Sequence, residues 1–483
     1  MLTMNPKMRS WEIALLGLVL VFTANTLKAQ EPDTPAEPKP AGRGIPALDE
    51  GALQDENAAR DQLDKWNPDT MPVTGLQSPT VGNPEFRHSY WVPGFQYSSS
   101  IQDQPAGGAN SGSWYAYNFF GANLSLLQQG SSSRLALNYS AGGFVTNQPG
   151  QDSGWYQQLA LSETFTWRRW QMQILDQFAY LPQSQFGFGG GTGLGVPGIG
   201  GPLGPTVPGI GGTVLPNQSI YAAVGPQYNN SIVTQLTYQT SRRGSITVGG
   251  SYGLLRFTEA GNVDSNSYMG NIGYNYQLSK EDSIGVYYRF TAFHYQNQPQ
   301  AIGDQTVNAV FSRKITKRLA LQLFGGPEIT NYRIPVGNSS QTVGGNGGAT
   351  LTSMFRNGSA SVGYFHALSG GSGVLIGSTT DQVNASASTR LTRLWSVHAN
   401  FGFAKNRPLA SQAGTQGSDY NSFYVGGGLD RPIGRNLNFG FAYTAQIQQV
   451  NPTVCAGPGC DTSFTQNILT VNLQWHTRPF VLR

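Results

Sequence analysis

The chain has 483 residues, of which only 12% are charged, with 30 Lys and Arg against 26 Asp and Glu. Its mean hydropathy is −0.29, and no run of 18 apolar residues follows residue 29, which excludes a helical membrane protein. The length fits either one large barrel or roughly two to three soluble domains.

The first 29 residues are typical of a secretory signal peptide. Lys7 and Arg9 supply the positive start, and the apolar run from Ile13 to Ala24 is too short to span a bilayer. We therefore expect an exported chain that is cleaved after Ala29.

Residues 30–85 are acidic, with eleven Asp and Glu against four Lys and Arg. Residues 30–46 are rich in Pro and Glu, which predicts disorder. The composition of residues 48–66 suits a short helix, either a solvated tether or an oligomerising or plug helix, and 67–85 is expected to be extended. We expect 30–85 to be a disordered and short-helical periplasmic segment.

Residues 437–447 alternate without exception. Leu437, Phe439 and Phe441 begin an apolar face, while Asn438 and Gly440 begin a small, polar one. The pattern recurs along the chain in segments of about ten residues, the length of a tilted strand that crosses a membrane. The apolar face suits contact with lipid, and the small, polar face suits contact with water.

This pattern predicts an all-β fold, a transmembrane antiparallel up-and-down β-barrel over residues 86–483. We expect about eighteen strands, an even number, and sixteen if the first and twelfth segments are not strands. The expected strands are 86–101, 114–127, 133–147, 155–168, 170–184, 226–241, 244–260, 265–279, 282–298, 304–316, 318–334, 347–356, 359–368, 379–390, 394–405, 419–431, 435–449 and 462–476.

Short charged turns alternate with long loops rich in Gly and Asn. Residues 279–282 and 432–435 are examples of the short turns. In bacterial barrels short turns face the periplasm and long loops face outward. Both termini should then be periplasmic.

Aromatic residues gather near the ends of these segments, as they do in the girdles of membrane barrels. The chain therefore resembles the outer-membrane β-barrel proteins of Gram-negative bacteria, and porin-like members in particular. The resemblance implies outer-membrane lipid and the barrel-assembly machinery as partners, with a homo-oligomer as one option. Family members usually end on an aromatic residue, whereas eight residues follow Trp475 here. The bases cluster in turns between strands, so no nucleic-acid partner is expected.

The polar face should line the channel. Its candidate channel-lining residues are Asn138, Asn271, Asn275, Gln277, Arg289, Thr291, His398, Asn400, Asn438, Thr444 and Asn472. Because most are small and hydrophilic, we expect a wet lumen that is not packed with side chains, although a barrel blocked by loops or by the N-terminal segment is the alternative.

The longest loop, 185–225, contains Val-Pro-Gly-Ile-Gly-Gly twice and carries no charge. It follows the fifth strand, as does the loop that narrows the pore in general porins. It is expected either to constrict the pore or to form an external flap.

Two carboxylates interrupt the apolar faces of neighbouring strands. If Trp167 pairs with Trp170, Glu163 lies opposite Ile174 and diagonal to Asp176. Charges toward lipid destabilise such barrels. The two acids therefore mark either a protein contact or a β-bulge that turns them inward, and we expect the bulge.

Cys455 and Cys460 bracket four residues in one short loop and are expected to form a disulfide. None of the five His residues lies in a recognisable Ser/His/acid or metal-ligand arrangement. We therefore expect no catalysis, no metal and no cofactor.

Two functions remain. One is a porin-like channel for passive diffusion of small hydrophilic solutes, with a slight anion preference from bases such as Arg289. The alternative is a structural, surface or export-associated barrel, serving polysaccharide export or adhesion without an open pore.

Overall fold

The computed structural model describes most of the region from Ser89 to Leu482. The described ranges are 67–68, 79–80, 89–103, 113–147, 153–181, 227–258, 263–296, 301–333, 340–355, 357–371, 376–392, 394–409, 420–434, 436–450, 464–478 and 480–482. The expected signal peptide, the helix at 48–66, loop 185–225 and the two cysteines lie outside these ranges.

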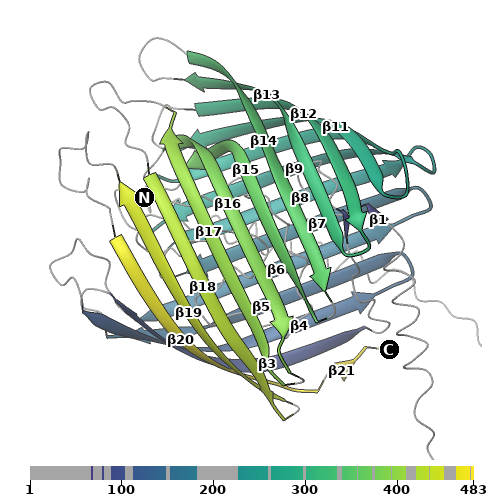
Figure 1. The fold of residues 1–483 in the computed structure, drawn as a ribbon. Helices are drawn as coiled ribbons and strands as arrows, with labels where there is room; N and C mark the ends of the chain where they lie inside the picture. The colour runs from purple at the N-terminus through teal and green to yellow at the C-terminus, as the bar shows by residue number, and fades with distance from the viewer. Residues whose placement is uncertain are drawn as a thin grey trace, which may run out of the picture. The chain divides into compact units, whose positions relative to one another are not determined.

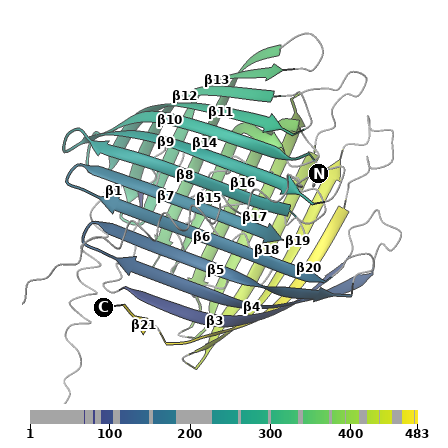
Figure 2. The same ribbon diagram turned by 180° about the vertical axis from the view of Figure 1, so that it is seen from behind.

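The described strands form one closed antiparallel barrel, in which each strand from β3 to β20 pairs with the next along the chain (Figures 1 and 2). The barrel closes where β20 pairs with β3. No helix among the described residues is long and apolar enough to cross a membrane.

The strands of the barrel are each 12 to 16 residues long, except the last. They are β3 (Tyr90–Asp103), β4 (Trp114–Gln129), β5 (Ser133–Thr146), β6 (Gly154–Thr166), β7 (Trp170–Leu181), β8 (Gln227–Gln239), β9 (Gly244–Phe257), β10 (Ser265–Gln277), β11 (Asp282–Tyr295), β12 (Ala301–Thr316), β13 (Leu319–Arg333), β14 (Ser340–Phe355), β15 (Gly358–Gly371), β16 (Ile376–Arg390), β17 (Ser396–Pro408), β18 (Tyr420–Ile433), β19 (Leu437–Val450), β20 (Phe464–His476) and β21 (Phe480–Val481). Two further strands, β1 (Asn67–Pro68) and β2 (Pro79–Thr80), pair only with each other.

The number of strands differs from the expected eighteen or sixteen. Over the described residues, the closed sheet contains β21 in addition to β3–β20, because the chain continues past Trp475 and pairs again with the beginning of β3. Phe480 stacks on Trp91 there, with ring centroids 4.8 Å apart. Each of the eighteen expected ranges overlaps one of the strands β3–β20, in the expected order.

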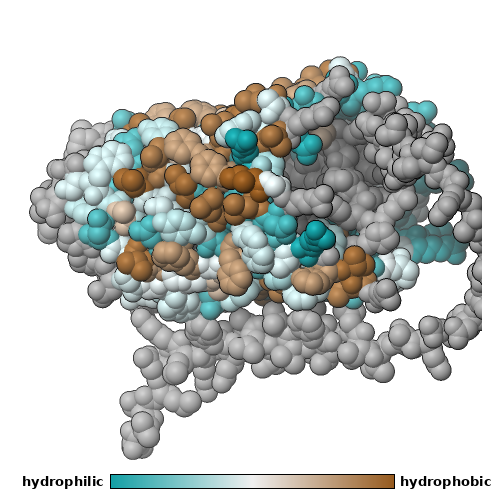
Figure 3. Space-filling model, turned by 90° about the horizontal axis from the view of Figure 1, so that it is seen from below, coloured by the Kyte–Doolittle hydropathy of each residue, from teal (hydrophilic) through white to brown (hydrophobic). Residues whose placement is uncertain are grey.

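Alternation along each strand gives the barrel two distinct faces. On β3, Phe95 is 64% exposed and Ile101 is 44% exposed, whereas the intervening Ser98 is fully buried. The face with exposed apolar side chains is the outer face, and the other is the inner face. Figure 3 shows brown and tan apolar residues gathered over the middle of one side of the described surface.

The two rims of the barrel differ in the length of their connections. We call the end with the short turns the turn rim and the other end the loop rim. At the turn rim, Ser279 Oγ accepts hydrogen bonds from the backbone N–H groups of Glu281 and Asp282, and Gly434 has a φ of 72°, which favours glycine. Strands β3 and β20 begin and end at this rim.

Strand β14 is longer than the expected segment 347–356. It begins at Ser340 and includes the run Gly344–Gly348, which pairs in continuous register with β13. Glycine carries no side chain to show alternation, so pairing with a regular neighbour decides the conformation here.

Candidate functional site on the inner face of the barrel

The inner face is largely polar, and its side chains form shared surfaces because paired residues of adjacent strands lie on the same face. On β3 it presents Gln96, Ser98, Ser100 and Gln102, all buried. Across the closure of the barrel, the hydroxyls of Ser100 and Thr470 lie 3.2 Å apart within hydrogen-bonding distance. The polar face therefore persists where the first and last long strands meet.

The register places all eleven expected channel residues on this inner face, but it does not gather them in one place. Asn271, Arg289 and Thr291 form one neighbourhood, because Asn271 lies opposite Arg289. Asn400 and Thr444 are linked through Gly426, which lies opposite both. The remaining six lie at other positions of the inner face and are Asn138, Asn275, Gln277, His398, Asn438 and Asn472.

A charged group centred on β11–β13 was not expected from the sequence. Arg289 Nη2 lies 3.7 Å from Asp304 Oδ2, and the side chains of these residues are 13% and 1% exposed. Thr330 Oγ1 donates a hydrogen bond of 3.5 Å to Asp304 Oδ1. The pair is nearly removed from solvent, where attraction between charges is stronger than at a surface.

Glu328 completes this charged group. It lies opposite Thr306, which in turn lies opposite Arg289. The carboxyl groups of Asp304 and Glu328 thus lie on the same face within two strands of the one guanidinium, and Arg289 does not act as an isolated base.

Several buried polar atoms beside this group have no hydrogen-bond partner. They are Arg289 Nε, Thr306 Oγ1, both side-chain polar atoms of Asn308 and Glu328 Oε1. Asn308 is fully buried and Thr306 is 1% exposed. Buried polar atoms in proteins are almost always satisfied by protein, water or ligand, so this neighbourhood has hydrogen-bonding capacity that no protein group uses.

The sequence contained a signal for the acids of this group. Asp304, Thr306 and Asn308 alternate on β12 as the polar face of that strand. The ion pair is diagonal, however, since Arg289 lies opposite Thr306 and Asp304 lies opposite Thr291. Only the register of the β11–β12 hairpin shows which base and acid meet.

The inner face is packed with side chains in two regions, where the expectation of a lumen free of such packing is wrong. On β4–β6, Tyr117, Phe119, Phe144 and Tyr156 form a buried cluster on the inner face, with the rings of Phe119 and Tyr156 edge to face at 5.9 Å. Gln96 Nε2 donates to the Tyr156 hydroxyl at 3.0 Å. Aromatic packing therefore occupies part of the inner wall.

The second apolar cluster lies toward the loop rim, beyond the charged group. Phe293, Tyr295, Ile302 and Tyr332 are all buried there, and the partly buried Leu368 and Leu409 pack against them. Gly377, with a φ of 70°, allows this approach, since a Cβ at this position would lie 2.1 Å from Ile302 Cδ1. The inner face of β11–β13 thus changes from apolar at the loop rim to charged further in.

Two of the histidines in the barrel strands, His366 and His398, each pair with one aspartate. His398 Nδ1 lies 3.1 Å from Asp430 Oδ2 on the inner face, and His366 Nδ1 lies 2.6 Å from Asp381 Oδ1 on the outer face. No group of three or more potential metal ligands occurs among the described residues. His398 is thereby oriented by an acid near the turn rim.

The expected β-bulge near Glu163 and Asp176 is absent from this part of the sheet. Glu163 lies opposite Leu135 and Ile174 in continuous register, and Asp176 lies opposite Leu161. Both acids therefore remain on the outer face, and the interpretation that they turn inward is wrong. Asn230 Nδ2 donates a hydrogen bond of 2.9 Å to Asp176 Oδ1, and a protein contact for Glu163 and Asp176 stays a prediction.

Aromatic rings mark two levels on the outer face around these acids. Near the turn rim, Trp170 lies against Tyr238 at 4.4 Å between ring centroids. Near the loop rim, Tyr180 lies between Trp155 at 4.2 Å and Tyr228 at 4.5 Å. Trp170 and Tyr180 are ten residues apart on β7, which is about 33 Å along a strand and about 25 Å along the axis at a tilt of about 40°.

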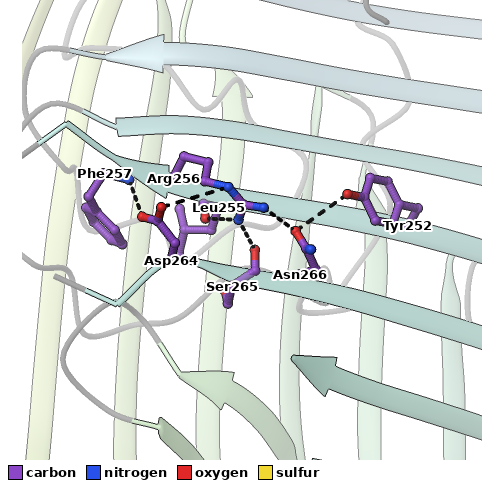
Figure 4. Close-up of polar contacts among 7 residues, drawn as sticks. All are labelled: Tyr252, Leu255, Arg256, Phe257, Asp264, Ser265 and Asn266. Carbon is purple, nitrogen blue, oxygen red and sulfur yellow. Dashed lines mark hydrogen bonds and ion pairs between the residues drawn. The ribbon is translucent and has the colours of Figure 1, made fainter. Parts of the chain in front are cut away.

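At the loop rim, polar side chains on the outer face form hydrogen bonds with the backbone and with one another. Arg256 Nη1 donates to the carbonyl oxygens of Leu255 and Ser265, and Nη2 donates to Asn266 Oδ1 at 2.7 Å (Figure 4). Asp264 Oδ2 lies 3.9 Å from Arg256 Nε. These contacts join the ends of β9 and β10 at the edge of the apolar band.

A closed antiparallel barrel with an exposed apolar band between two aromatic levels and a polar inner face defines a transmembrane β-barrel. Among the solved structures that it resembles in fold are outer-membrane porins of Pseudomonas.

OpdQ of Pseudomonas aeruginosa matches with a TM-score of 0.41 and 10% identity over 81% of this chain and 98% of that chain. A BenF-like porin from Pseudomonas fluorescens Pf-5 matches with a TM-score of 0.41 and 9% identity over 82% and 99%. The outer membrane protein OpdK of Pseudomonas aeruginosa matches with a TM-score of 0.41 and 8% identity over 80% and 99%. Similarity at this level carries no conclusion about solutes.

No family model and no curated protein matches the chain.

Proposed function

We propose that this protein is an outer-membrane channel through which small hydrophilic solutes diffuse passively. The observation that carries the proposal is the largely polar inner face, with the charged group of Arg289, Asp304 and Glu328 set into its wall. A barrel of this size is wide enough for an aqueous passage, unlike one of eight strands. A polar inner face is the lining that a water-filled passage requires.

The charge balance of this group supports weak selectivity between cations and anions. The guanidinium of Arg289 is paired with Asp304, and Glu328 contributes a second carboxyl group. We therefore revise the slight anion preference that Arg289 alone predicts: the group has no net positive charge to favour anions.

The test is the single-channel conductance of the purified, full-length protein in a planar bilayer. The proposed channel gives discrete current steps, with a permeability ratio for K⁺ over Cl⁻ near one. A wild-type protein that is folded but gives no current would overturn the proposal.

The second candidate is a barrel without an open pore that serves surface adhesion or polysaccharide export. The burial of Asp304, Thr306 and Asn308 and the aromatic cluster on β4–β6 favour it, because an open, wet wall would leave such side chains more exposed. Deleting residues 190–212 of loop 185–225 separates the two candidates. A silent wild type whose deletion variant conducts indicates a loop that closes the pore, whereas two silent proteins indicate a structural barrel.

The proposal includes an arrangement of the chain in the membrane. Residues 1–29 are a signal peptide, 30–85 a periplasmic segment and 86–483 the barrel, with both termini in the periplasm. The support is that β3 begins and β20 ends at the turn rim, the rim that faces the periplasm in bacterial barrels.

A further inference from the structure

Four arginines lie on two neighbouring turns of the turn rim. Arg168 and Arg169 form the tip of the turn between β6 and β7, and Arg242 and Arg243 lie in the turn between β8 and β9. All four residues are exposed, and we call them the arginine patch. A guanidinium carries its positive charge throughout the physiological pH range, so the patch is a concentrated positive surface.

Backbone hydrogen bonds hold the two turns side by side. Strands β7 and β8 are paired neighbours in the barrel wall (Figure 2). Where they end, the backbone N–H of Gln239 donates to the carbonyl oxygen of Arg169 at 2.8 Å. Within the second turn, Ser241 Oγ accepts a hydrogen bond of 2.8 Å from the backbone N–H of Gly244. None of these bonds uses a guanidinium, so the side chains of the arginine patch are not needed to shape the turns.

The arginine patch has no acidic residue among its neighbours along the chain. The segments 164–175 and 231–258, which contain the four arginines, include no Asp and no Glu. On the β5 side, the adjoining turn 130–132 carries no charge. The positive charge of the patch is therefore concentrated on these two turns.

The turn on the other side of the patch carries charges of both signs. In this turn, 278–281, Lys280 precedes Glu281. Asp282, which follows the turn, lies 3.7 Å from Arg313. Each acid is thus accompanied by a base, and the positive charge of the arginine patch exceeds that of the acids nearby.

Exposed tryptophans place the arginine patch at the level of the lipid headgroups. Trp167 and Trp170 flank the first turn and are 51% and 44% exposed, and the Trp167 N–H donates to the Trp170 carbonyl oxygen at 2.8 Å. Arg168 and Arg169 lie one residue beyond them, about 3–4 Å along the strand direction. The headgroup layer is about 5–8 Å thick on each side of a bilayer, and tryptophan marks its boundary with the hydrocarbon. The guanidinium groups therefore lie among the headgroups.

We propose that the arginine patch binds the phosphate group of an anionic phospholipid in the leaflet at the turn rim. Guanidinium groups form charge-assisted and often bidentate hydrogen bonds with phosphate oxygens, and each base near an anionic membrane surface adds attraction. A lipid fits better than a soluble polyanion because the patch lies beside exposed tryptophans that contact the bilayer. The inference needs only a barrel that spans a bilayer, whether or not it conducts and whichever rim faces outward.

The experiment is native mass spectrometry of the purified full chain in a neutral detergent, titrated with phosphatidylglycerol. Arg168→Gln/Arg169→Gln and Arg242→Gln/Arg243→Gln should each weaken the first binding step at least about tenfold, because each variant removes two bases from the site. Phosphatidylcholine carries a choline cation that balances its phosphate, so it should bind the wild type at least about tenfold more weakly than phosphatidylglycerol.

Lys280→Gln/Arg313→Gln is the matched control. It also removes two positive charges at the turn rim, but from residues beside Glu281 and Asp282 and outside the arginine patch. Its affinity for phosphatidylglycerol should stay within about twofold of that of the wild type. Equal weakening by the control and by both patch variants would indicate a general effect of charge and overturn the site.

Two further results decide whether the ligand is an anionic lipid. Equal binding of phosphatidylglycerol and phosphatidylcholine by the wild type would reject recognition of an anionic headgroup. Displacement of phosphatidylglycerol by millimolar glycerol phosphate, which lacks acyl chains, would reject the lipid and indicate a site for soluble phosphates. Heat-dependent migration of each variant in gels verifies folding. Conductance is recorded separately, so a silent barrel that binds phosphatidylglycerol contradicts only the proposed channel.

Discussion

Arg289 on β11 and Asp304 on β12 form an ion pair across a hairpin in which neither lies directly opposite the other. Their nearest charged atoms are 3.7 Å apart, while the register places Thr306 opposite Arg289 and Thr291 opposite Asp304. The pair is therefore diagonal, and each charge also lies beside a threonine. This arrangement makes the net charge of the inner wall depend on both residues together.

The double variant Asp304→Asn/Glu328→Gln should shift the channel toward anions, because Arg289 then loses both carboxyl groups that can balance its charge. A confined charge in a passage of low dielectric constant biases ion entry more than the same charge in water. We expect the permeability ratio for Cl⁻ over K⁺, measured from reversal potentials in a salt gradient, to rise by roughly two- to tenfold.

The triple variant Arg289→Gln/Asp304→Asn/Glu328→Gln is the control for this shift. It removes the base together with both acids and should return the ratio to near one. Folding of both variants is verified first, because a buried charge left without its partner destabilises by about 3–5 kcal/mol. A triple variant as anion-selective as the double variant would show that Arg289 is not the source of the anion preference.

The orientation of the barrel can be tested with epitope tags in intact cells. A tag in 409–419 or 451–463, which connect strands at the loop rim, should be labelled from outside. A tag in the turn 434–436 should be labelled only after the outer membrane is permeabilised. Labelling of the turn tag on intact cells, with the loop tags protected, would reverse the orientation.

The sequence predicts a strand of this fold only where apolar and polar side chains alternate clearly along it. Alternation on β19 and β20 predicted the strands and their faces because apolar and polar residues differ clearly there. The beginning of β14 could not be predicted, since four of the five residues in Gly344–Gly348 are glycines, which have no side chains to alternate. Its conformation follows from pairing with β13, which is a property of the register rather than of the local sequence.

The charged group of Arg289, Asp304 and Glu328 could not be predicted from the sequence for a related reason. Arg289 was predicted on the polar face, but its neighbours Asp304 and Glu328 come from two other strands, and a shift of one residue in register would send either to the opposite face. The outward position of Glu163 was misjudged because a charge toward lipid is unfavourable in isolation. The continuous register of β6 with β5 and β7 overrides that cost.

Glu163→Leu tests whether the outer face of β6 and β7 contacts another protein molecule. Glu163 lies between the two aromatic levels, beside the apolar residues Leu135 and Ile174. If the acid serves self-association, the variant should shift the protein toward monomer in sedimentation experiments in detergent. The barrel itself should be stabilised by on the order of 1–2 kcal/mol, because Glu163 is 4% exposed and a buried carboxyl group is replaced by an apolar side chain.

Gln157→Leu, a polar-to-apolar change on the same face of β6, is the control for a general effect of added apolar surface. A Glu163→Leu variant that is more stable but sediments like the wild type would remove the support for a protein contact.

The proposed disulfide between Cys455 and Cys460 should close a loop at the loop rim. So small a loop constrains the unfolded chain only modestly, and we expect its removal in Cys455→Ser/Cys460→Ser to lower the free energy of unfolding by about 2 kcal/mol. Mass spectrometry of the unreduced protein should find a mass two hydrogens below that of the reduced form. Two alkylatable thiols in the native protein would contradict the prediction.

Gly142→Ala should destabilise the barrel near the aromatic cluster on β4–β6. Gly142 lies opposite both Gly121 and Tyr156, and a Cβ at residue 142 would lie 1.9 Å from the backbone oxygen of Phe120. Because a backbone atom cannot move aside as a side chain can, β4 and β5 must separate locally, at a cost of about 1–3 kcal/mol.

The neighbouring Gly143→Ala is the matched control, since its added Cβ would meet only the Gly154 oxygen, at 3.5 Å. Denaturant titration in detergent should show a lower midpoint for Gly142→Ala alone, and equal midpoints for the two variants would contradict the close approach of β4 and β5.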